Sequence, residues 1–167
     1  MTSAVDAARQ VNGAENLKEE EGHGAILFRV GHEYLALPLE DVGEIHEMEE
    51  ISVLPLSPPF LGGVINVHGI LASVINLDVI LDVQETGDGR FLIRLIPERG
   101  GIALRVDNTF GMVRYSLLEE VAVAQESASG KVHIVEGVFR SGDNLISLIN
   151  PDKLCAWIDE ALAKGDE

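Results

Sequence analysis

The residues best suited to chemistry in this chain are five histidines, one cysteine and many carboxylates. A zinc-hydrolase site needs two histidines at helical spacing, as in His-x-x-x-His, so that both side chains lie on one helix face. His32-Glu33 begins such a motif, but no second histidine follows at that spacing, and the pair falls on a predicted strand. The single cysteine, Cys155, excludes a cysteine-built zinc site and an internal disulfide framework. These residues therefore predict no metal site.

Motifs for phosphate binding and nucleophilic catalysis are also missing from the sequence. Gly130-Lys131 has no preceding glycine at P-loop spacing, and neither G-x-S-x-G nor G-x-G-x-x-G occurs. Cys155 lies inside a predicted helix, where a small, partly buried side chain is a better interpretation than a nucleophile. We therefore expect a protein that is not an enzyme and has no cofactor.

One acidic segment, residues 40–50, lies on a predicted strand. In an extended strand, alternate side chains point to opposite sides. One side holds Val42, Glu44 and His46, and the other holds Gly43, Ile45 and Glu47. A solvated acidic edge and a docking edge for another chain fit this pattern equally well.

The charge of the chain bears on its partners, because 28 Asp and Glu against 12 Lys and Arg give a formal net charge of −16. Such a chain repels phosphate backbones and anionic lipids, and aromatic residues make up only 5% of it, so an oligonucleotide-binding barrel is disfavoured. A barrel that binds a small ligand stays open as an alternative, although barrels of this size are normally filled by their own side chains. We expect no nucleic-acid partner.

The expected location is cytoplasmic, because the N-terminus shows no basic segment followed by an apolar run. Residues 51–77 carry no Asp, Glu, Lys or Arg, yet prolines, glycines, amides and a histidine interrupt them. Prolines and amide groups are costly in lipid, so this segment is predicted to be buried strands and turns, with no direct membrane insertion.

Ten short apolar runs separated by turn signals predict an all-β fold. We expect residues 1–23 to form a disordered acidic tail, residues 24–163 to form the folded part, and residues 164–167 to form a second tail. The predicted strands cover residues 25–30, 34–39, 42–48, 63–67, 70–76, 91–96, 102–106, 110–115, 132–139 and 145–149. Residues 78–82 are predicted to form one helical turn with Asp78 as its N-cap.

A C-terminal helix over residues 151–163 is predicted, with Asn150 as N-cap and Pro151 at its first position. Its apolar face would hold Leu154, Trp157, Ile158, Ala161 and Leu162. No other segment predicts a helix of this length.

The two halves of the chain resemble each other at offsets of 65 to 74 residues. Gly63-Val64-Ile65 matches Gly137-Val138-Phe139, and Ser73-Val74-Ile75-Asn76 matches Ser147-Leu148-Ile149-Asn150. Offsets of 65, 67 and 68 relate Ile26-Leu27-Phe28-Arg29 to Phe91-Leu92-Ile93-Arg94, Ala36-Leu37 to Ala103-Leu104, and Gly43 to Gly111. We therefore expect two tandem five-stranded barrels packed together, one over about 24–82 and one over about 90–150.

The order of these segments resembles the CheW-like chemotaxis coupling domain, from about Ala25 to Ala163. The residues that carry the resemblance are Phe28-Arg29-Val30-Gly31, Tyr34 to Leu39, Val42-Gly43-Glu44-Ile45, Leu54-Pro55, Pro59 to Asn66, Gly69, Ser73 to Leu77, Gly101 to Asp107 and Gly137-Val138. The resemblance implies two SH3-like barrels and an adaptor without catalysis. Its partners would be the regulatory domain of a CheA-type histidine kinase and the cytoplasmic tip of a chemoreceptor, which would recruit it to membrane receptor arrays.

The resemblance also implies a partner-binding surface. Its residues would be Val42, Glu44, Ile45, Asn66, His68 and Gly69. Val42 and Ile45 would supply apolar contact, Glu44 and His68 would set polar register, and Gly69 would form a turn. A role in maintaining the fold is the alternative for all six.

His68 departs from the family, which usually has arginine there, close to the glutamate that matches Glu44. An imidazole cannot make the bidentate pair that a guanidinium makes. A kinase-only scaffold or inhibitor of a divergent chemosensory system, without receptor contact, is therefore an alternative function.

Overall fold

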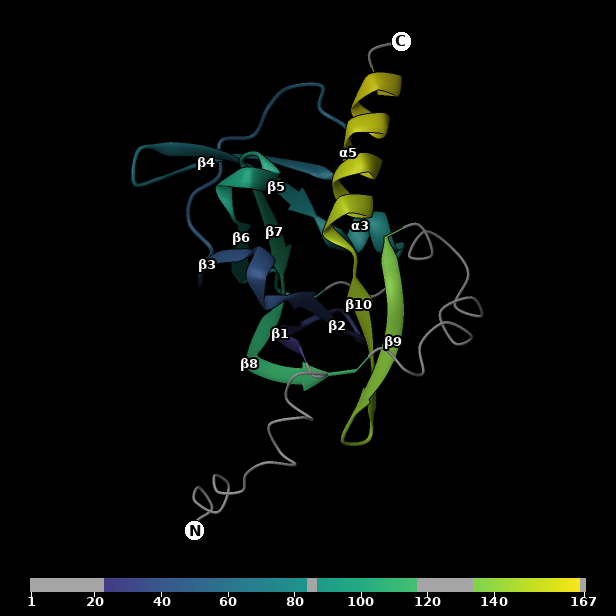
Figure 1. The fold of residues 1–167 in the computed structure, drawn as a ribbon. Coiled ribbons are helices and arrows are strands. Elements are labelled where there is room, and N and C mark those ends of the chain that lie inside the picture. Colours follow the sequence, from purple (N-terminus) through teal and green to yellow (C-terminus); the bar gives the residue numbers. More distant parts are fainter. Residues whose placement is uncertain (1–22, 84–86, 117–133, 166–167) are drawn as a thin grey trace.

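A computed structural model describes residues 23–83, 87–116 and 134–165 (Figure 1). These residues form ten strands, two short 3₁₀ helices, two α-helices and their connections. In spatial order, the first sheet contains β8 (Asn108–Tyr115), β1 (His23–Val30), β2 (Glu33–Pro38), β10 (Asn144–Ile149) and β9 (Val135–Ser141). The second sheet contains β3 (Val42–Glu47), β6 (Phe91–Leu95), β7 (Ile102–Val106), β5 (Ile70–Asn76) and β4 (Leu61–Val67). The helical segments are η1 (Leu39–Asp41), α3 (Leu77–Leu81), η2 (Pro97–Arg99) and α5 (Pro151–Gly165).

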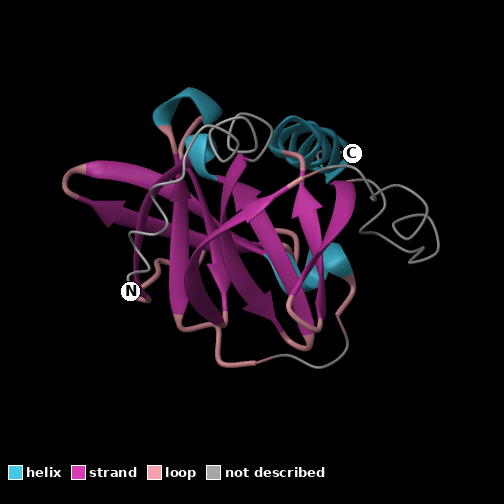
Figure 2. Cartoon of the chain, turned by 60° about the horizontal axis from the view of Figure 1, so that its bottom comes forward, coloured by secondary structure: helices cyan, strands magenta, loops and turns pink. Residues whose placement is uncertain are grey.

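The prediction of two five-stranded sheets with a C-terminal helix is confirmed, and Figure 2 shows the strands packed into one body with helices at its periphery. The uncharged stretch of residues 51–77 forms a loop, β4, β5 and the first residue of α3. Its strands are confirmed, but its predicted burial is not complete, because Val53, Leu56 and Leu71 are exposed. Among the described residues, no helix is long and apolar enough to cross a membrane. Of the tail predicted for residues 1–23, His23 belongs to β1 instead, and residues 1–22 lie outside the described residues, as does the start of the strand predicted at residue 132.

The matched segments of the two halves occupy equivalent places in the two sheets. The order β8-β1-β2-β10-β9 of the first sheet corresponds, strand by strand, to the order β3-β6-β7-β5-β4 of the second. Each pair of strands matched in sequence therefore holds the same position in its sheet. The expected division into one barrel over 24–82 and another over 90–150 is wrong, however. The first sheet combines β1 and β2 with β8, β9 and β10, whereas the second combines β6 and β7 with β3, β4 and β5. Each half therefore gives its first two strands to the sheet that the other half completes.

Two short connections cause this exchange. The chain leaves β2 through η1 and enters β3 of the other sheet, and it leaves β7 through Asp107 and enters β8. The buried Asp107 carboxylate accepts hydrogen bonds from the backbone N–H groups of Gly31 and Gly89, both at 2.6 Å. At the other connection, Arg99 Nε donates to the buried Asp41 carboxylate at 2.9 Å. Both crossing points thus contain a buried carboxylate whose oxygens accept hydrogen bonds, and burying such a group without these bonds would be costly.

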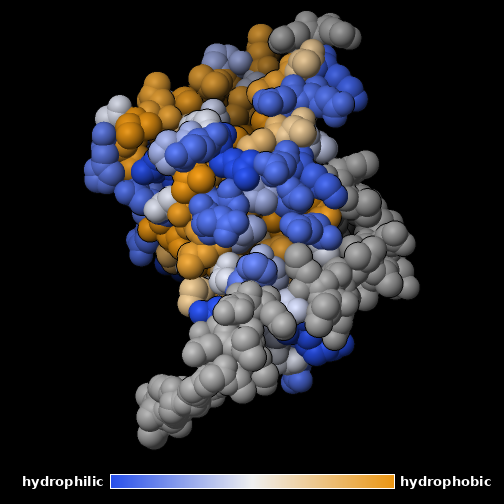
Figure 3. All heavy atoms as spheres, in the orientation of Figure 1, coloured by the Kyte–Doolittle hydropathy of each residue, from blue (hydrophilic) through white to orange (hydrophobic). Residues whose placement is uncertain are grey.

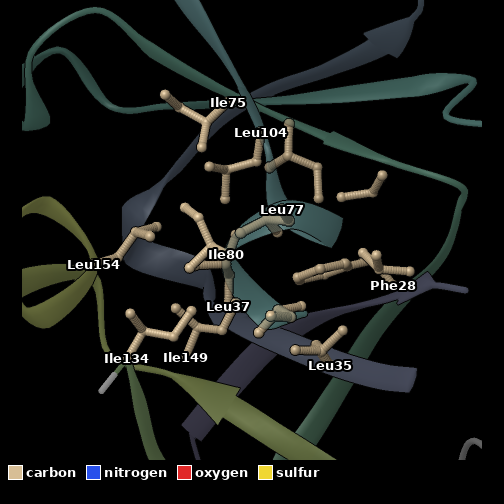
Figure 4. Close-up of a cluster of buried hydrophobic side chains, with 14 of the residues drawn as sticks. Phe28, Leu35, Leu37, Ile75, Leu77, Ile80, Leu104, Ile134, Ile149 and Leu154 are labelled. Atoms are coloured by element: carbon tan, nitrogen blue, oxygen red, sulfur yellow. The ribbon is translucent and has the colours of Figure 1, made fainter. Parts of the chain in front are cut away.

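Three hydrophobic clusters form the core. The largest cluster lies between the sheets and contains Phe28 and Leu37 from the first sheet, Ile75 and Leu104 from the second, and Leu154 from α5 (Figure 4). Two smaller clusters each lie within one barrel. They contain Ile65, Val67, Ala72, Val74, Leu92 and Ala103 in one case, and Ala25, Ala36, Phe139, Ile146 and Leu148 in the other. The strands β1, β2, β6 and β7 bury side chains on both faces, which is why their apolar runs are nearly continuous.

Helix α5 covers the shared cluster through Leu154 and Ile158, and its Trp157 ring packs edge-on against Phe60. Asn150 caps its first turn as predicted, because the Asn150 side-chain oxygen accepts from the Lys153 N–H at 3.1 Å. Leu162 does not belong to the buried face; it is exposed, in the last turns of a helix that continues to Gly165.

The predicted N-cap of the short helix is also wrong. The position before α3 is Asn76 instead of Asp78, and no side chain caps that helix. The Asn76 amide group points elsewhere and donates to the Pro59 carbonyl at 3.1 Å. A helix of one turn is held here by burial of Leu77, Ile80 and Leu81, not by a cap.

Candidate functional site

The first three candidate residues lie on β3, an edge strand whose neighbour in the sheet is β6. Residues Val42 and Glu44 pair with the consecutive residues Leu95 and Arg94, so Gly43 forms a bulge. A Cβ atom on Gly43 would lie 3.1 Å from two β6 carbonyl oxygens, so the bulge needs glycine. Val42 packs against the shared cluster. Val42 therefore supports the fold, which was the alternative role for it.

Glu44 forms its ion pair with Arg94 on β6. The Glu44 Oε1 atom lies 3.3 Å from Arg94 Nη2 and 3.9 Å from His46 Nε2. The Arg94 side chain is largely buried, so its guanidinium holds the carboxylate in place, while the Glu44 side chain remains 42% exposed. Arg94 thus orients the Glu44 carboxylate, part of which remains exposed to solvent.

The resemblance implies that the residue at position 68 lies close to Glu44, and the contacts of Glu44 bear on this expectation. No ion pair joins His68 to Glu44 in the described part of the chain, and Arg94 occupies the place next to the carboxylate. Sequence reasoning missed Arg94 because its register opposite Glu44 depends on strands far apart in the chain. No local pattern in the sequence pairs Arg94 with Glu44.

The other three candidates form the turn between β4 and β5. Val67 pairs with Ile70, which leaves His68 and Gly69 as a two-residue loop, with φ angles of 54° and 83°. Positive φ at both central residues is typical of a type I′ hairpin turn. The Asn66 side-chain oxygen accepts from the Gly69 N–H at 2.9 Å. Asn66 and Gly69 therefore maintain the turn, and His68 is exposed at its tip.

The candidates on β3 and the candidates in the β4–β5 turn belong to the same barrel. In its strand order, β3 and β4 are the two end strands. The segment after β3 returns to β4 at Ser52, which exchanges backbone hydrogen bonds of 2.9 Å with Val64. No hydrogen bond or ion pair between described side chains joins the two groups directly. The structure thus places both groups on one barrel, with no polar contact recorded between them among the described residues.

Exposed apolar side chains on β5 and on the loop before β4 were missed by sequence reasoning. Ile70 and Leu71, which follow it on β5, are 53% and 64% exposed. Val53, Leu54 and Leu56 from the neighbouring loop are exposed as well. Figure 3 shows hydrophobic side chains gathered at the upper left, over β4 and β5. Exposed apolar residues that gather on one face are typical of a protein-binding surface. The signal in the sequence was a pair of large apolar residues directly after a hairpin turn.

The small-ligand alternative would need a sizeable cavity inside a barrel. A cavity of about 210 Å³ lies at the junction of the sheets instead of inside a barrel. Its lining residues are Val30, Asn76, Asp78, Gly87, Asp88, Gly89, Arg105 and Asp107. Small-molecule sites usually enclose about 300–1,000 Å³ and are mostly apolar, whereas this cavity has acidic walls. The ligand-binding alternative gains no support from it.

Metal-ligating side chains and the single thiol are the remaining reactive groups. Among the described residues, no group of three or more His, Cys, Asp or Glu side chains could hold a metal ion. Cys155 is partly buried in α5, as predicted, and burial raises the pKa of its thiol. A raised pKa keeps the thiol protonated at neutral pH, which disfavours a nucleophilic role.

Comparison with known proteins agrees with this geometry. Residues 24–159 match the family model of the CheW-like domain. The chain is 21% identical over 150 residues to the chemotaxis protein CheW of Treponema pallidum (strain Nichols), covering 81% of this chain and 83% of the relative. It also matches the crystal structure of the scaffolding protein TtCheW from Thermoanaerobacter tengcongensis. That match has a TM-score of 0.67 and 22% identity, and it covers 77% of this chain and 88% of the other. The chain belongs to the CheW-like domain family of chemotaxis scaffold proteins.

Proposed function

We propose that this protein is the adaptor that couples the cytoplasmic tip of a chemoreceptor to the regulatory domain of a CheA-type histidine kinase. The observation that carries the proposal is the family match over residues 24–159, which includes both sheets and most of α5. An adaptor needs separate surfaces on a rigid body, and a shared core between two barrels provides such a body. The proposed location is the cytoplasm, at receptor arrays to which its partners recruit it.

The receptor-binding surface is assigned to the barrel of β3–β7. Glu44, Ile45 and His68 are its contact residues, because they are exposed or half-exposed on β3 and at the hairpin tip. Val42, Asn66 and Gly69 position them by packing and turn formation. Arg94 joins the site because it orients Glu44.

The apolar side chains around the turn extend this surface. Leu71 is exposed in the same sheet as β3, and a buried apolar contact supplies most of the binding energy in protein interfaces. The repeat offers a matched control, because Leu145 occupies the equivalent position on β10 at an offset of 74 and is also exposed. Leu71→Ser is expected to weaken receptor binding, and Leu145→Ser is expected to leave it unchanged.

The test measures binding of a receptor-tip fragment and of the kinase regulatory domain, each by calorimetry. Glu44→Ala is expected to weaken receptor binding by about tenfold and kinase binding by less than about twofold. Glu160→Ala, an exposed acidic position on α5, serves as control for loss of one charge and should change neither. Binding of the kinase without the receptor by the wild type would support the kinase-only scaffold instead. Binding of neither partner would contradict the proposal.

A further inference from the structure

The loop between β3 and β4 presents a leucine that neither its backbone conformation nor its packing explains. Leu56 has a φ angle of 61°, in the left-handed region, and it is fully exposed. In that region the Cβ atom of an L residue crowds the following carbonyl oxygen, so glycine and asparagine are preferred there. Among the described residues, the other non-glycine residues with positive φ angles are His68 and Asp82, whose types accept this conformation more readily.

The loop around Leu56 is braced in one conformation. Three prolines lie within three residues of Leu56, and each proline ring fixes one φ angle. The Ser57 Oγ atom donates a hydrogen bond to the Leu54 carbonyl at 3.0 Å. Beyond it, Asn76 Nδ2 donates to the Pro59 carbonyl at 3.1 Å. The exposed Leu56 side chain is thus presented from a rigid backbone.

Both ends of the loop are anchored to the folded body. Ser52 exchanges backbone hydrogen bonds of 2.9 Å with Val64. At the other end, Phe60 is buried and its ring packs edge-on against Trp157, with ring centroids 5.1 Å apart. A contact that is already ordered before binding loses little conformational entropy when it binds, which favours its use in an interface.

The loop lies at the end of β4 that is opposite to the β4–β5 turn (Figure 1). Leu61 begins β4 beside the loop, and Val67 ends it beside the turn. A strand of seven residues separates its two ends by about 20 Å. Leu56 is therefore at the far end of β4 from His68, which is assigned above to the receptor-binding surface.

The chemistry of the loop indicates what kind of surface it can contact. Residues 51–60 contain no Asp, Glu, Lys or Arg, in a chain whose formal net charge is −16. A partner can approach this loop without meeting a local charge, and Val53 and Leu54 add exposed apolar area to it. Because the Leu56 side chain neither donates nor accepts hydrogen bonds, the surface that covers it must be an apolar pocket. Backbone strain and exposed apolar residues both occur at functional sites.

We propose that Leu56 docks into an apolar pocket on the regulatory domain of the kinase, with Val53 and Leu54 around it. This inference rests on the proposed function, because an adaptor that holds the receptor on β3 and the β4–β5 turn needs a separate surface for its second partner. Glycine or asparagine at position 56 would relax the backbone but would remove the apolar contact. The strained leucine is therefore kept for binding.

The test compares the wild type with Leu56→Asn by calorimetry, against the kinase regulatory domain and against a receptor-tip fragment. Leu56→Asn is expected to weaken kinase binding by about tenfold and receptor binding by less than about twofold. It should also raise the midpoint of thermal unfolding by about 2–4 °C, since asparagine accepts the left-handed conformation. A variant that is more stable yet binds more weakly distinguishes a docking role from a structural one.

Two further variants complete the comparison. Leu56→Met keeps a flexible apolar side chain and should retain kinase binding within about threefold of the wild type. Leu145→Asn changes an exposed leucine on β10 in the same way and should leave kinase binding unchanged.

The outcomes separate this inference from the proposed function. If the wild type binds the kinase and Leu56→Asn binds it equally well, the inference is overturned and the proposed function stands. Equal losses for both partners, together with a lower unfolding midpoint, would show a structural role for Leu56 and would also overturn the inference. A wild type that binds no kinase would contradict the proposed function and the inference together.

Discussion

In the β4–β5 turn, some residues stabilise the backbone conformation and one is exposed to solvent. Gly69 has a positive φ angle and no atom within 4 Å of the place its Cβ would take. Asn66 accepts a hydrogen bond from the Gly69 N–H, whereas His68 is exposed at the tip. The three neighbours should therefore respond differently to substitution.

Gly69→Ala is expected to lower the free energy of unfolding by about 1 kcal/mol, because an L side chain is strained at this φ angle. Since the new methyl group meets no neighbour, strain alone causes the loss. Denaturant titration measures the effect, and His68→Ala at the same tip serves as the comparison. A loss above about 3 kcal/mol would show a packing role that the structure does not contain.

Cys155 gives a second test, based on the raised pKa of its thiol. Because burial raises the pKa in the folded chain, the folded protein has less thiolate at pH 8 than the unfolded chain. Alkylation by iodoacetamide should therefore be several-fold slower in native buffer than in denaturant at the same pH. The folded protein should also lose stability as the pH rises through the unfolded thiol pKa, since the unfolded chain deprotonates first. Equal alkylation rates in the two states would contradict the assignment.

The candidate site shows which residue roles can be predicted from the sequence. The turn is local, so Asn66 and Gly69 could be assigned from their types and spacing. The partner of Glu44 could not be assigned, because Arg94 meets it only through the register of β3 with β6. The burial of β3 follows the alternation that the sequence predicts, because Val42, Glu44 and His46 lie on its more buried side.

Among the elements, α5 was predicted most completely, because its cap and apolar spacing are local features. Its attachment to the body is not local: Trp157 packs against Phe60, and Arg99 bonds to Asp152 in the first turn of the helix. That hydrogen bond to Asp152 raises the pKa of the Arg99 guanidinium, which stays charged. The helix is therefore a structural cover of the shared cluster.

Leu154→Ala tests this role of α5. Leu154 is fully buried in the shared cluster, so its truncation should cost about 3 kcal/mol of unfolding free energy. Leu162→Ala, in the same helix but exposed, is the matched control and should change stability by less than about 0.5 kcal/mol. Thermal or denaturant unfolding of both variants measures the difference. Equal effects would show that α5 does not cover the cluster.

The position of each strand along the chain was predicted well from the sequence. The neighbouring strands in each sheet were not. Alternation and turn residues locate each strand, because these signals act within a few residues. The exchange of β1 and β2 for β6 and β7 depends on the two crossings at Asp41 and Asp107. A repeat in the sequence shows which segments are equivalent, but it does not show in which sheet each segment lies.

For the whole molecule, the exchange makes the two barrels interdependent. The shared cluster is larger than either barrel cluster, and it includes strands from both sheets. Unfolding should therefore be one cooperative transition, with the same midpoint by far-UV circular dichroism and by Trp157 fluorescence. Two separated transitions in calorimetry would show that the barrels are independent.

The most direct measurement of the adaptor function is co-sedimentation of the kinase with receptor-containing vesicles in the presence and absence of this protein. The kinase should pellet with the vesicles when the wild-type protein is added, and much less kinase should pellet with Glu44→Ala. The control Glu160→Ala should retain the wild-type level. Kinase recruitment that is equal with and without the wild-type protein would contradict the proposal that this chain couples the two partners.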